Sequence, residues 1–242
     1  MICTIYIIIL IYFLLGGISF YLINRNKDAQ VARKSYTKFI TYFFIINILF
    51  FSIVVKPVVF TFLAALIIGV GYYELFKLFR LSKYQLNGFF GLSLFIYTVL
   101  STGFFLFSTL DKGLILFSFL ILSIFDSFSQ ISGQLWGRTK LLPEISPNKT
   151  VGGLIGGALV ALASSLLLDD LYNGLPLKSV LMAAGVVSFA FAGDVAASFY
   201  KRKYQVKDFS KLIPGHGGFL DRFDSLIAGG AWVTFSVFVF NY

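Results

Sequence analysis

The sequence predicts an all-α, polytopic integral membrane protein: a single helical domain over residues 1–242, with about eight transmembrane helices and both termini outside. Of the 242 residues, 58% are hydrophobic and only 13% are charged, whereas roughly a quarter are charged in soluble domains. Long apolar runs alternate with short polar clusters along the chain. A chain this apolar cannot cover itself with polar surface, so the composition excludes an ordinary soluble domain and a disordered chain.

Eight apolar runs can form helices that cross a bilayer core, which needs about 20 residues per helix. We expect them approximately at residues 2–23, 39–55, 57–79, 86–110, 113–135, 151–168, 179–200 and 225–240. The first run lacks the basic start and cleavage site of a secretion signal, so we interpret it as a retained transmembrane helix. Small residues at four-residue spacing open the sixth run, which favours close helix packing rather than chemistry.

The basic residues indicate the orientation. The loops after the first, third, fifth and seventh spans hold 17 of the 20 Lys and Arg residues, and the alternate loops hold Lys56, Lys112 and Lys178. Because basic loops tend to stay in the cytoplasm, this asymmetry supports eight spans and places both termini outside. The net charge of +9 is then mainly a topology signal, and we expect no nucleic-acid partner.

Three acidic residues stand inside or at the end of apolar runs: Glu74, Asp126 and Asp194. Acids in hydrocarbon are costly and call for a partner or a function. The alternative for each acid is a purely structural role, either in an internal ion pair or with its carboxylate reaching the membrane–water interface. Asp194 is followed by Ser198 and Lys201 at helical offsets of four and seven, which places a carboxylate, a hydroxyl and an ammonium on one face.

The segment 201–224 is unlike a simple connecting loop. It holds six basic residues, three aspartates, the single histidine and a Pro-Gly-His-Gly-Gly turn. Glycines there let the backbone approach a ligand closely. Carboxylates beside Lys and Arg suit a metal-bound polyphosphate. A patch that attracts acidic lipid explains the lysines, but neither the aspartates nor the glycine turn.

This segment strongly resembles the signature of the CTP:phosphatidate cytidylyltransferase family, also called CDP-diacylglycerol synthases. The match within residues 198–224 consists of Ser198, Lys201, Arg202, Lys207, Asp208, Pro214, His216, Gly217, Gly218, Asp221, Arg222 and Asp224. A second, weaker block covers Asp126, Gly133, Gly137, Lys140 and residues 145–150. The resemblance extends over about 125–228, which we expect to be the catalytic half. The chain departs from the family pattern at Gln134, often arginine, and at Gly152, often glutamate.

The resemblance implies an integral membrane enzyme that joins CTP and phosphatidate into CDP-diacylglycerol and pyrophosphate for phospholipid synthesis. It implies that Asp194 and Asp221 hold Mg²⁺ and a second cation, for which we expect K⁺, and Asp126 is a further candidate ligand. We expect Ser198, Lys149, Gly217 and Gly218 to bind CTP and its phosphates. The expected catalytic residues are Lys201, Arg202, Lys207, Asp208, His216, Arg222 and Asp224.

Three alternatives stay open at this point. They are a CTP-dependent kinase of the polyprenol or phytol type, cytidylyl transfer to a different lipid phosphate, and a non-enzymatic transporter or inactive paralogue. The signature in segment 198–224 argues against the kinase, and no missing signature residue marks an inactive paralogue. We expect the protein in a bacterial inner membrane, in contact with membrane lipid, with its site facing the cytoplasm and a homodimer as a plausible assembly.

Overall fold

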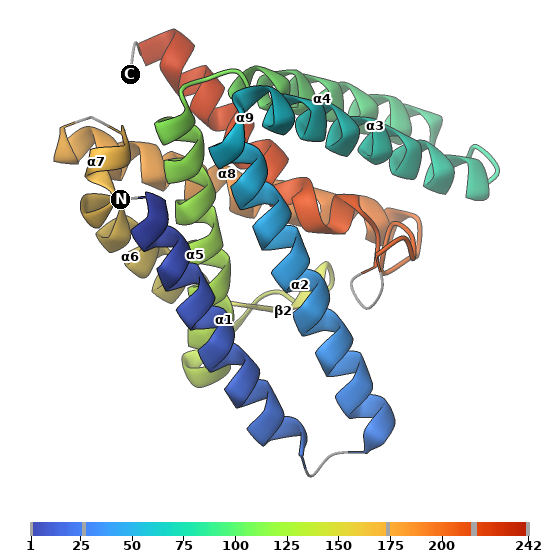
Figure 1. Cartoon of the computed structure of the whole chain (residues 1–242). Coiled ribbons are helices and arrows are strands. Elements are labelled where there is room, and N and C mark those ends of the chain that lie inside the picture. Colours follow the sequence, from blue (N-terminus) through green and yellow to red (C-terminus); the bar gives the residue numbers. More distant parts are fainter. Residues whose placement is uncertain (1, 26–27, 173–174, 214–216, 241–242) are drawn as a thin grey trace.

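The computed structural model describes residues 2–25, 28–172, 175–213 and 217–240. Figure 1 shows a bundle of long helices with one small hairpin of two antiparallel strands. The elements are α1 (Ile2–Asn24), α2 (Ala29–Val55), α3 (Pro57–Leu81), α4 (Asn87–Phe107), α5 (Lys112–Trp136), β1 (Lys140–Leu142), β2 (Ser146–Thr150), α6 (Val151–Leu167), α7 (Asp169–Tyr172), α8 (Pro176–Lys203) and α9 (Leu220–Phe240).

The predicted class is confirmed, because the chain is an all-α polytopic membrane protein. Each of the eight predicted spans forms a helix. Within the described residues, α2, α3, α4, α5, α8 and α9 contain spans long and apolar enough to cross a membrane, and the apolar helices Ile2–Ile11 and Val151–Leu167 are shorter. The hairpin and α7 were not predicted. The last helix begins at Leu220 rather than near residue 225. The signature residues Asp221, Arg222 and Asp224 are therefore helical.

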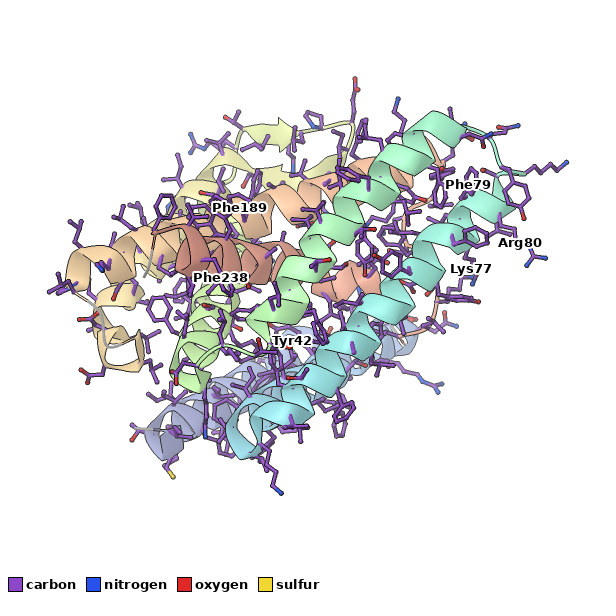
Figure 2. The ribbon with its side chains drawn as sticks, turned by 90° about the horizontal axis from the view of Figure 1, so that it is seen from above. Tyr42, Lys77, Phe79, Arg80, Phe189 and Phe238 are labelled. Atoms are coloured by element: carbon purple, nitrogen blue, oxygen red, sulfur yellow. The ribbon has the colours of Figure 1, made fainter. Side chains whose placement is uncertain are left out.

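The helix ends that carry the basic loops point away from the chain termini. In Figure 1 the ends of α1, α3, α5 and α8 point down or to the right, away from both labelled termini. Figure 2 shows Lys77 and Arg80 at the same outer end of α3. The helix α5 contacts α2, α6, α7, α8 and α9. The bundle is therefore built around α5.

Close contact between α5 and α6 depends on glycine. A Cβ added to Gly157 would lie 2.8 Å from the Phe125 carbonyl oxygen, and one added to Gly153 would lie 2.7 Å from the Ser129 carbonyl oxygen. The predicted packing role of these small residues is confirmed. The Thr150 hydroxyl accepts a hydrogen bond from the Gly153 N–H at 3.1 Å and so caps α6 directly after β2.

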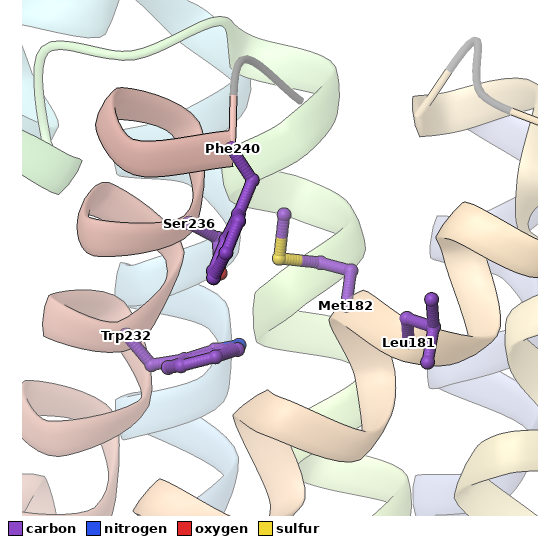
Figure 3. A pocket seen from close by; sticks show the side chains of 5 residues that line it. All are labelled: Leu181, Met182, Trp232, Ser236 and Phe240. Carbon is purple, nitrogen blue, oxygen red and sulfur yellow. The ribbon is translucent and has the colours of Figure 1, made fainter.

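A pocket of about 220 Å³ lies between the beginning of α8 and the end of α9. Figure 3 shows its lining side chains, which come from Leu181, Met182, Trp232, Ser236 and Phe240. No acidic or basic side chain lines it. Since it lies at the ends of α8 and α9 opposite the signature segment, a charged nucleotide would not bind there.

We predict that Gly157→Ala lowers the stability of the protein by about 1–3 kcal/mol, because the added methyl group must push α5 away from α6. Gly91→Ala is the matched control, since nothing lies within 4 Å of a Cβ at that helical glycine. Thermal unfolding in detergent compares the two. A Gly157→Ala protein as stable as the Gly91→Ala protein would contradict the packing.

Candidate active site

A buried ion pair joins the end of α8 to the first turn of α9. The Lys201 ammonium lies 2.5 Å from Asp221 Oδ1, and the two side chains are 10% and 2% exposed. Asp221 Oδ2 accepts hydrogen bonds from the Phe209 N–H at 2.9 Å and the Gly218 N–H at 2.8 Å. The partial positive charge at a helix N-terminus also favours a carboxylate there. Asp221 therefore fixes the loop between the two helices from both sides.

A second carboxylate, that of Glu74 on α3, holds the same loop. Glu74 is fully buried. Its Oε1 accepts from the Ser210 hydroxyl at 2.5 Å and the Phe219 N–H at 2.9 Å, and its Oε2 accepts from the Leu220 N–H at 2.7 Å. The first N–H groups of a helix lack partners within the helix. Glu74 supplies them for α9, so a residue of the first half of the chain caps the helix that carries the signature.

The glycines of the signature have specific places in this loop. A Cβ on Gly218 would lie 2.8 Å from Asp221 Oδ2 and 2.9 Å from Glu74 Oε1. Gly217 has a φ of +85°, and a Cβ there would lie 2.9 Å from Asp208 Cγ. Only glycine fits between the two carboxylates at position 218. The predicted catalytic residue His216 lies outside the described residues.

The hairpin β1–β2 brings Lys149 to α8. The Lys149 ammonium lies 2.5 Å from Asp194 Oδ2, and it also lies over the Phe191 ring at 4.5 Å from the centroid. The Ser198 hydroxyl donates to Asp194 Oδ1 at 3.4 Å, as the four-residue spacing predicts. The Asp194 side chain is 38% exposed. Unlike Asp221, Asp194 is accessible to a ligand.

Asp126 of α5 joins these groups. It lies within electrostatic range of Asp194, Asp224, Lys149 and Arg222, and it lines a cavity together with Arg222. Asp224 in turn lies within electrostatic range of Asp194, Asp221 and Lys201. The structure thus brings seven predicted site residues into one group, called here the acid–base cluster: Lys149, Lys201, Arg222, Asp126, Asp194, Asp221 and Asp224.

Three predicted catalytic residues stand apart from the acid–base cluster. The Arg202 guanidinium donates from Nε to the Ile145 carbonyl at 3.0 Å and from an Nη to the Val206 carbonyl at 2.9 Å. It therefore ties the hairpin to the loop after α8 and is a positioning residue in this structure. Lys207 and Asp208 are exposed on that loop, and their catalytic roles stay predictions.

Sequence reasoning missed two residues of the site. Glu74 was expected only to be an acid that is costly to bury. Its role as a cap of α9 depends on contacts with residues 136 to 146 positions away in the sequence. Tyr42 of α2 lines the cavity with Asp126 and Arg222 and makes a side-chain hydrogen bond with Ser127. Figure 2 shows Tyr42 inside the outline of the bundle. One tyrosine among 13 carries no sequence signal of its own.

Residues 84–240 match the model of the cytidylyltransferase family. The chain belongs to this family. The matched region contains the whole acid–base cluster, whereas Glu74 and Tyr42 precede it. The predicted family is confirmed.

Several bacterial proteins are similar to the second half of the chain. Phosphatidate cytidylyltransferase of Haemophilus influenzae is 38% identical over 134 residues, which are 50% of this chain and 46% of that protein. Phosphatidate cytidylyltransferase of Bacillus subtilis is 40% identical over 119 residues, 48% of this chain and 44% of that protein. Uncharacterized protein YnbB of Escherichia coli is 42% identical over 113 residues, 45% and 38% of the two chains. The chain thus spans less than half the length of each relative.

The carboxylates fit a Mg²⁺ ion that arrives with a nucleotide. Among the described residues, no three His, Cys, Asp or Glu side chains are grouped closely enough to hold a metal by themselves. Mg²⁺ is usually bound by one or two carboxylates together with substrate phosphates. Asp126 faces a cavity, and Asp194 is partly exposed with Lys149 and Ser198 on its two oxygens, so a ligand can reach both, whereas both oxygens of the buried Asp221 are held by Lys201 and two backbone N–H groups. Asp221 would have to release Lys201 to bind a metal.

We predict that Glu74→Ala loosens the loop before α9. The variant leaves the Phe219 and Leu220 N–H groups without an acceptor, and hydrogen bonds to a charged group contribute about 1.5–3 kcal/mol each. Amide hydrogen exchange around residues 209–220 should accelerate by about tenfold or more. Glu144→Ala, at an exposed position of the hairpin turn, should leave exchange there unchanged. Equal exchange in the two variants would contradict the cap.

Proposed function

We propose that this protein is a membrane cytidylyltransferase that condenses CTP with phosphatidate to give CDP-diacylglycerol and pyrophosphate for phospholipid synthesis. The observation that carries the proposal is the acid–base cluster, in which α5, β2, α8 and α9 supply alternating carboxylates and cations inside the region matched to the family. Two of the relatives named above are phosphatidate cytidylyltransferases.

The reaction needs charge neutralisation more than it needs a protein nucleophile. A phosphate oxygen of phosphatidate attacks the α-phosphorus of CTP in line, the bond from that phosphorus to the oxygen of the β-phosphate breaks, and pyrophosphate leaves. The attacking phosphate is already ionised near neutral pH. Lys149 and Arg222 are the cations that can neutralise the phosphate charges of the transition state, whereas Lys201 is paired with Asp221.

The chemistry that Mg²⁺ would supply when bound with CTP is Lewis-acid charge that stabilises the phosphate groups. Asp194 and Asp126 are the residues we propose to hold it, whereas Asp221, both of whose oxygens have partners, has no place for a second cation such as K⁺ while Lys201 is bound. Lys149 is paired with the exposed Asp194, so incoming phosphates can compete for its ammonium group. Lys201 is buried against Asp221 and keeps the loop in place while the reaction proceeds.

We propose a bacterial inner membrane with the cluster on the cytoplasmic face. CTP is a soluble cytoplasmic nucleotide, and basic loops tend to stay on the cytoplasmic side. Lys201 stands in the last turn of α8 and Arg222 in the first turn of α9, on either side of one of those basic loops. The acceptor lipid would reach the same site from within the bilayer.

The proposal predicts a specific distribution of label. Purified protein in detergent micelles is supplied with Mg²⁺, phosphatidate and CTP labelled at the α-phosphorus. Label should enter the lipid phase with an equal amount of pyrophosphate. Label transferred from the γ-phosphorus to a polyprenol, with release of CDP, would identify a lipid kinase instead. Absence of nucleotide turnover with phosphatidate, other lipid phosphates and polyprenols would contradict the enzyme assignment.

Asp194→Asn should lower turnover by about 100-fold or more, because it removes charge from an accessible carboxylate at the reacting phosphates. Asp170→Asn is the control, since Asp170 is exposed next to the far end of α6. Unfolding temperature and gel-filtration profile should match the wild type in both. Near-normal turnover of Asp194→Asn would remove Asp194 from the metal site.

A further inference from the structure

Tyr200, near the end of α8, binds the backbone of α3. Tyr200 is buried, with 4% of the residue exposed. Its hydroxyl donates a hydrogen bond to the Leu75 carbonyl oxygen at 2.8 Å, across 125 positions of the sequence. Leu75 lies inside α3, so this oxygen has one lone pair for its helical hydrogen bond and a second one for Tyr200. The helix α3 thereby holds α8 at the residue directly before Lys201.

The ring of Tyr200 connects this contact to the buried ion pair of Lys201 and Asp221. It stacks with the Phe209 ring, with centroids 5.8 Å and planes 24° apart. Phe209 contacts both partners of the ion pair. The Lys201 ammonium lies over its ring at 5.2 Å from the centroid, and its N–H donates to Asp221 Oδ2 at 2.9 Å. A shift of the Tyr200 ring would therefore move the residue that both partners contact.

Two adjacent residues of α3 hold the two ends of the loop between α8 and α9. The Leu75 carbonyl binds Tyr200 before the loop, and the Glu74 carboxylate binds the first N–H groups of α9 after it. The buried ion pair joins the same two ends directly. A tyrosine hydroxyl is neutral near pH 7, so Tyr200 adds no charge to the site and acts through the positions of its neighbours.

We propose that Tyr200 is a positioning residue for the acid–base cluster: its hydrogen bond to the Leu75 carbonyl keeps Lys201 and Asp221 aligned while the reaction proceeds. The inference rests on the cytidylyltransferase function proposed above. It adds a second contact by which α3, which precedes the region matched to the family, sets the geometry of that region.

The chain offers a matched control for Tyr200→Phe, namely Tyr97→Phe. Tyr97 on α4 is 8% exposed, and its hydroxyl donates to the Ile68 carbonyl oxygen of α3 at 3.1 Å. Each variant therefore removes one hydroxyl that binds a carbonyl of the same helix. Ile68 lies seven residues before Leu75, which is about 10 Å along the helix axis. The Tyr97 ring packs against the ring of Tyr72.

Tyr200→Phe should lower kcat/KM for CTP by about tenfold or more, because small displacements of groups at a reacting centre are costly. Tyr97→Phe should stay within about twofold of wild type, and the two variants should unfold at similar temperatures. In a Lys201→Met background, Tyr200→Phe should lower the residual kcat/KM by less than about twofold, since the ammonium that it aligns is already absent.

Amide hydrogen exchange without substrates measures the same alignment independently of turnover. The Phe209 N–H, which donates to Asp221, should exchange about tenfold faster in Tyr200→Phe than in wild type. Its exchange in Tyr97→Phe should equal that of wild type. This measurement also decides the question if Lys201→Met does not fold.

The outcomes separate this inference from the proposed function. Equal kcat/KM values in Tyr200→Phe and Tyr97→Phe would overturn it, and so would a full tenfold effect of Tyr200→Phe in the Lys201→Met background. Unchanged exchange at Phe209 in Tyr200→Phe would overturn it as well. If wild-type protein turns over no CTP, the proposed function fails, whereas the exchange rates still show whether Tyr200 holds the ion pair in place.

Discussion

The site depends on one buried carboxylate, that of Glu74, which binds the backbone where α9 begins. A buried charge is tolerated only when it is paired or hydrogen-bonded, and Glu74 meets this requirement with the Ser210 hydroxyl and two N–H groups. The position of Asp221 follows from that of Leu220, one residue earlier on the same turn. Asp221 in turn places Lys201. A helix from the first half of the chain thus fixes the geometry of a signature in the second half.

Close packing of the helix backbones positions the part of the site in which Lys149 contacts Asp194. Glycines at the start of α6 let that helix lie against α5, and the hairpin before α6 carries Lys149 across to Asp194. Gly152, one of the departures from the family pattern, belongs to this packing, because a Cβ there would lie 2.9 Å from the Trp136 carbonyl oxygen. In this chain the position serves the turn from α5 into the hairpin and α6, and a side chain would need the turn to shift.

Much of the fold could be predicted because the length of an apolar run and the charge of the next loop can both be read from a short stretch of sequence. The contact of Asp194 with Ser198 could also be predicted, since it follows from one helical turn. The start of α9 was placed too late because Asp221, Arg222 and Asp224 make the segment look like a loop, whereas their partners lie in other elements. The hairpin is too short to leave a periodic pattern. The cap by Glu74 and the place of Tyr42 depend on contacts between distant segments, and no spacing rule encodes them.

The most direct test of the account is the affinity of the purified protein for CTP with Mg²⁺, measured by calorimetry in the absence of lipid, for wild type, Glu74→Gln and Glu74→Ala. The account predicts a loss of affinity that is largest for alanine and partly restored by glutamine, whose amide oxygen can still accept a backbone hydrogen bond. Glu74→Ala protein that binds CTP as tightly as wild type would contradict the claim that this carboxylate holds the site in its active shape.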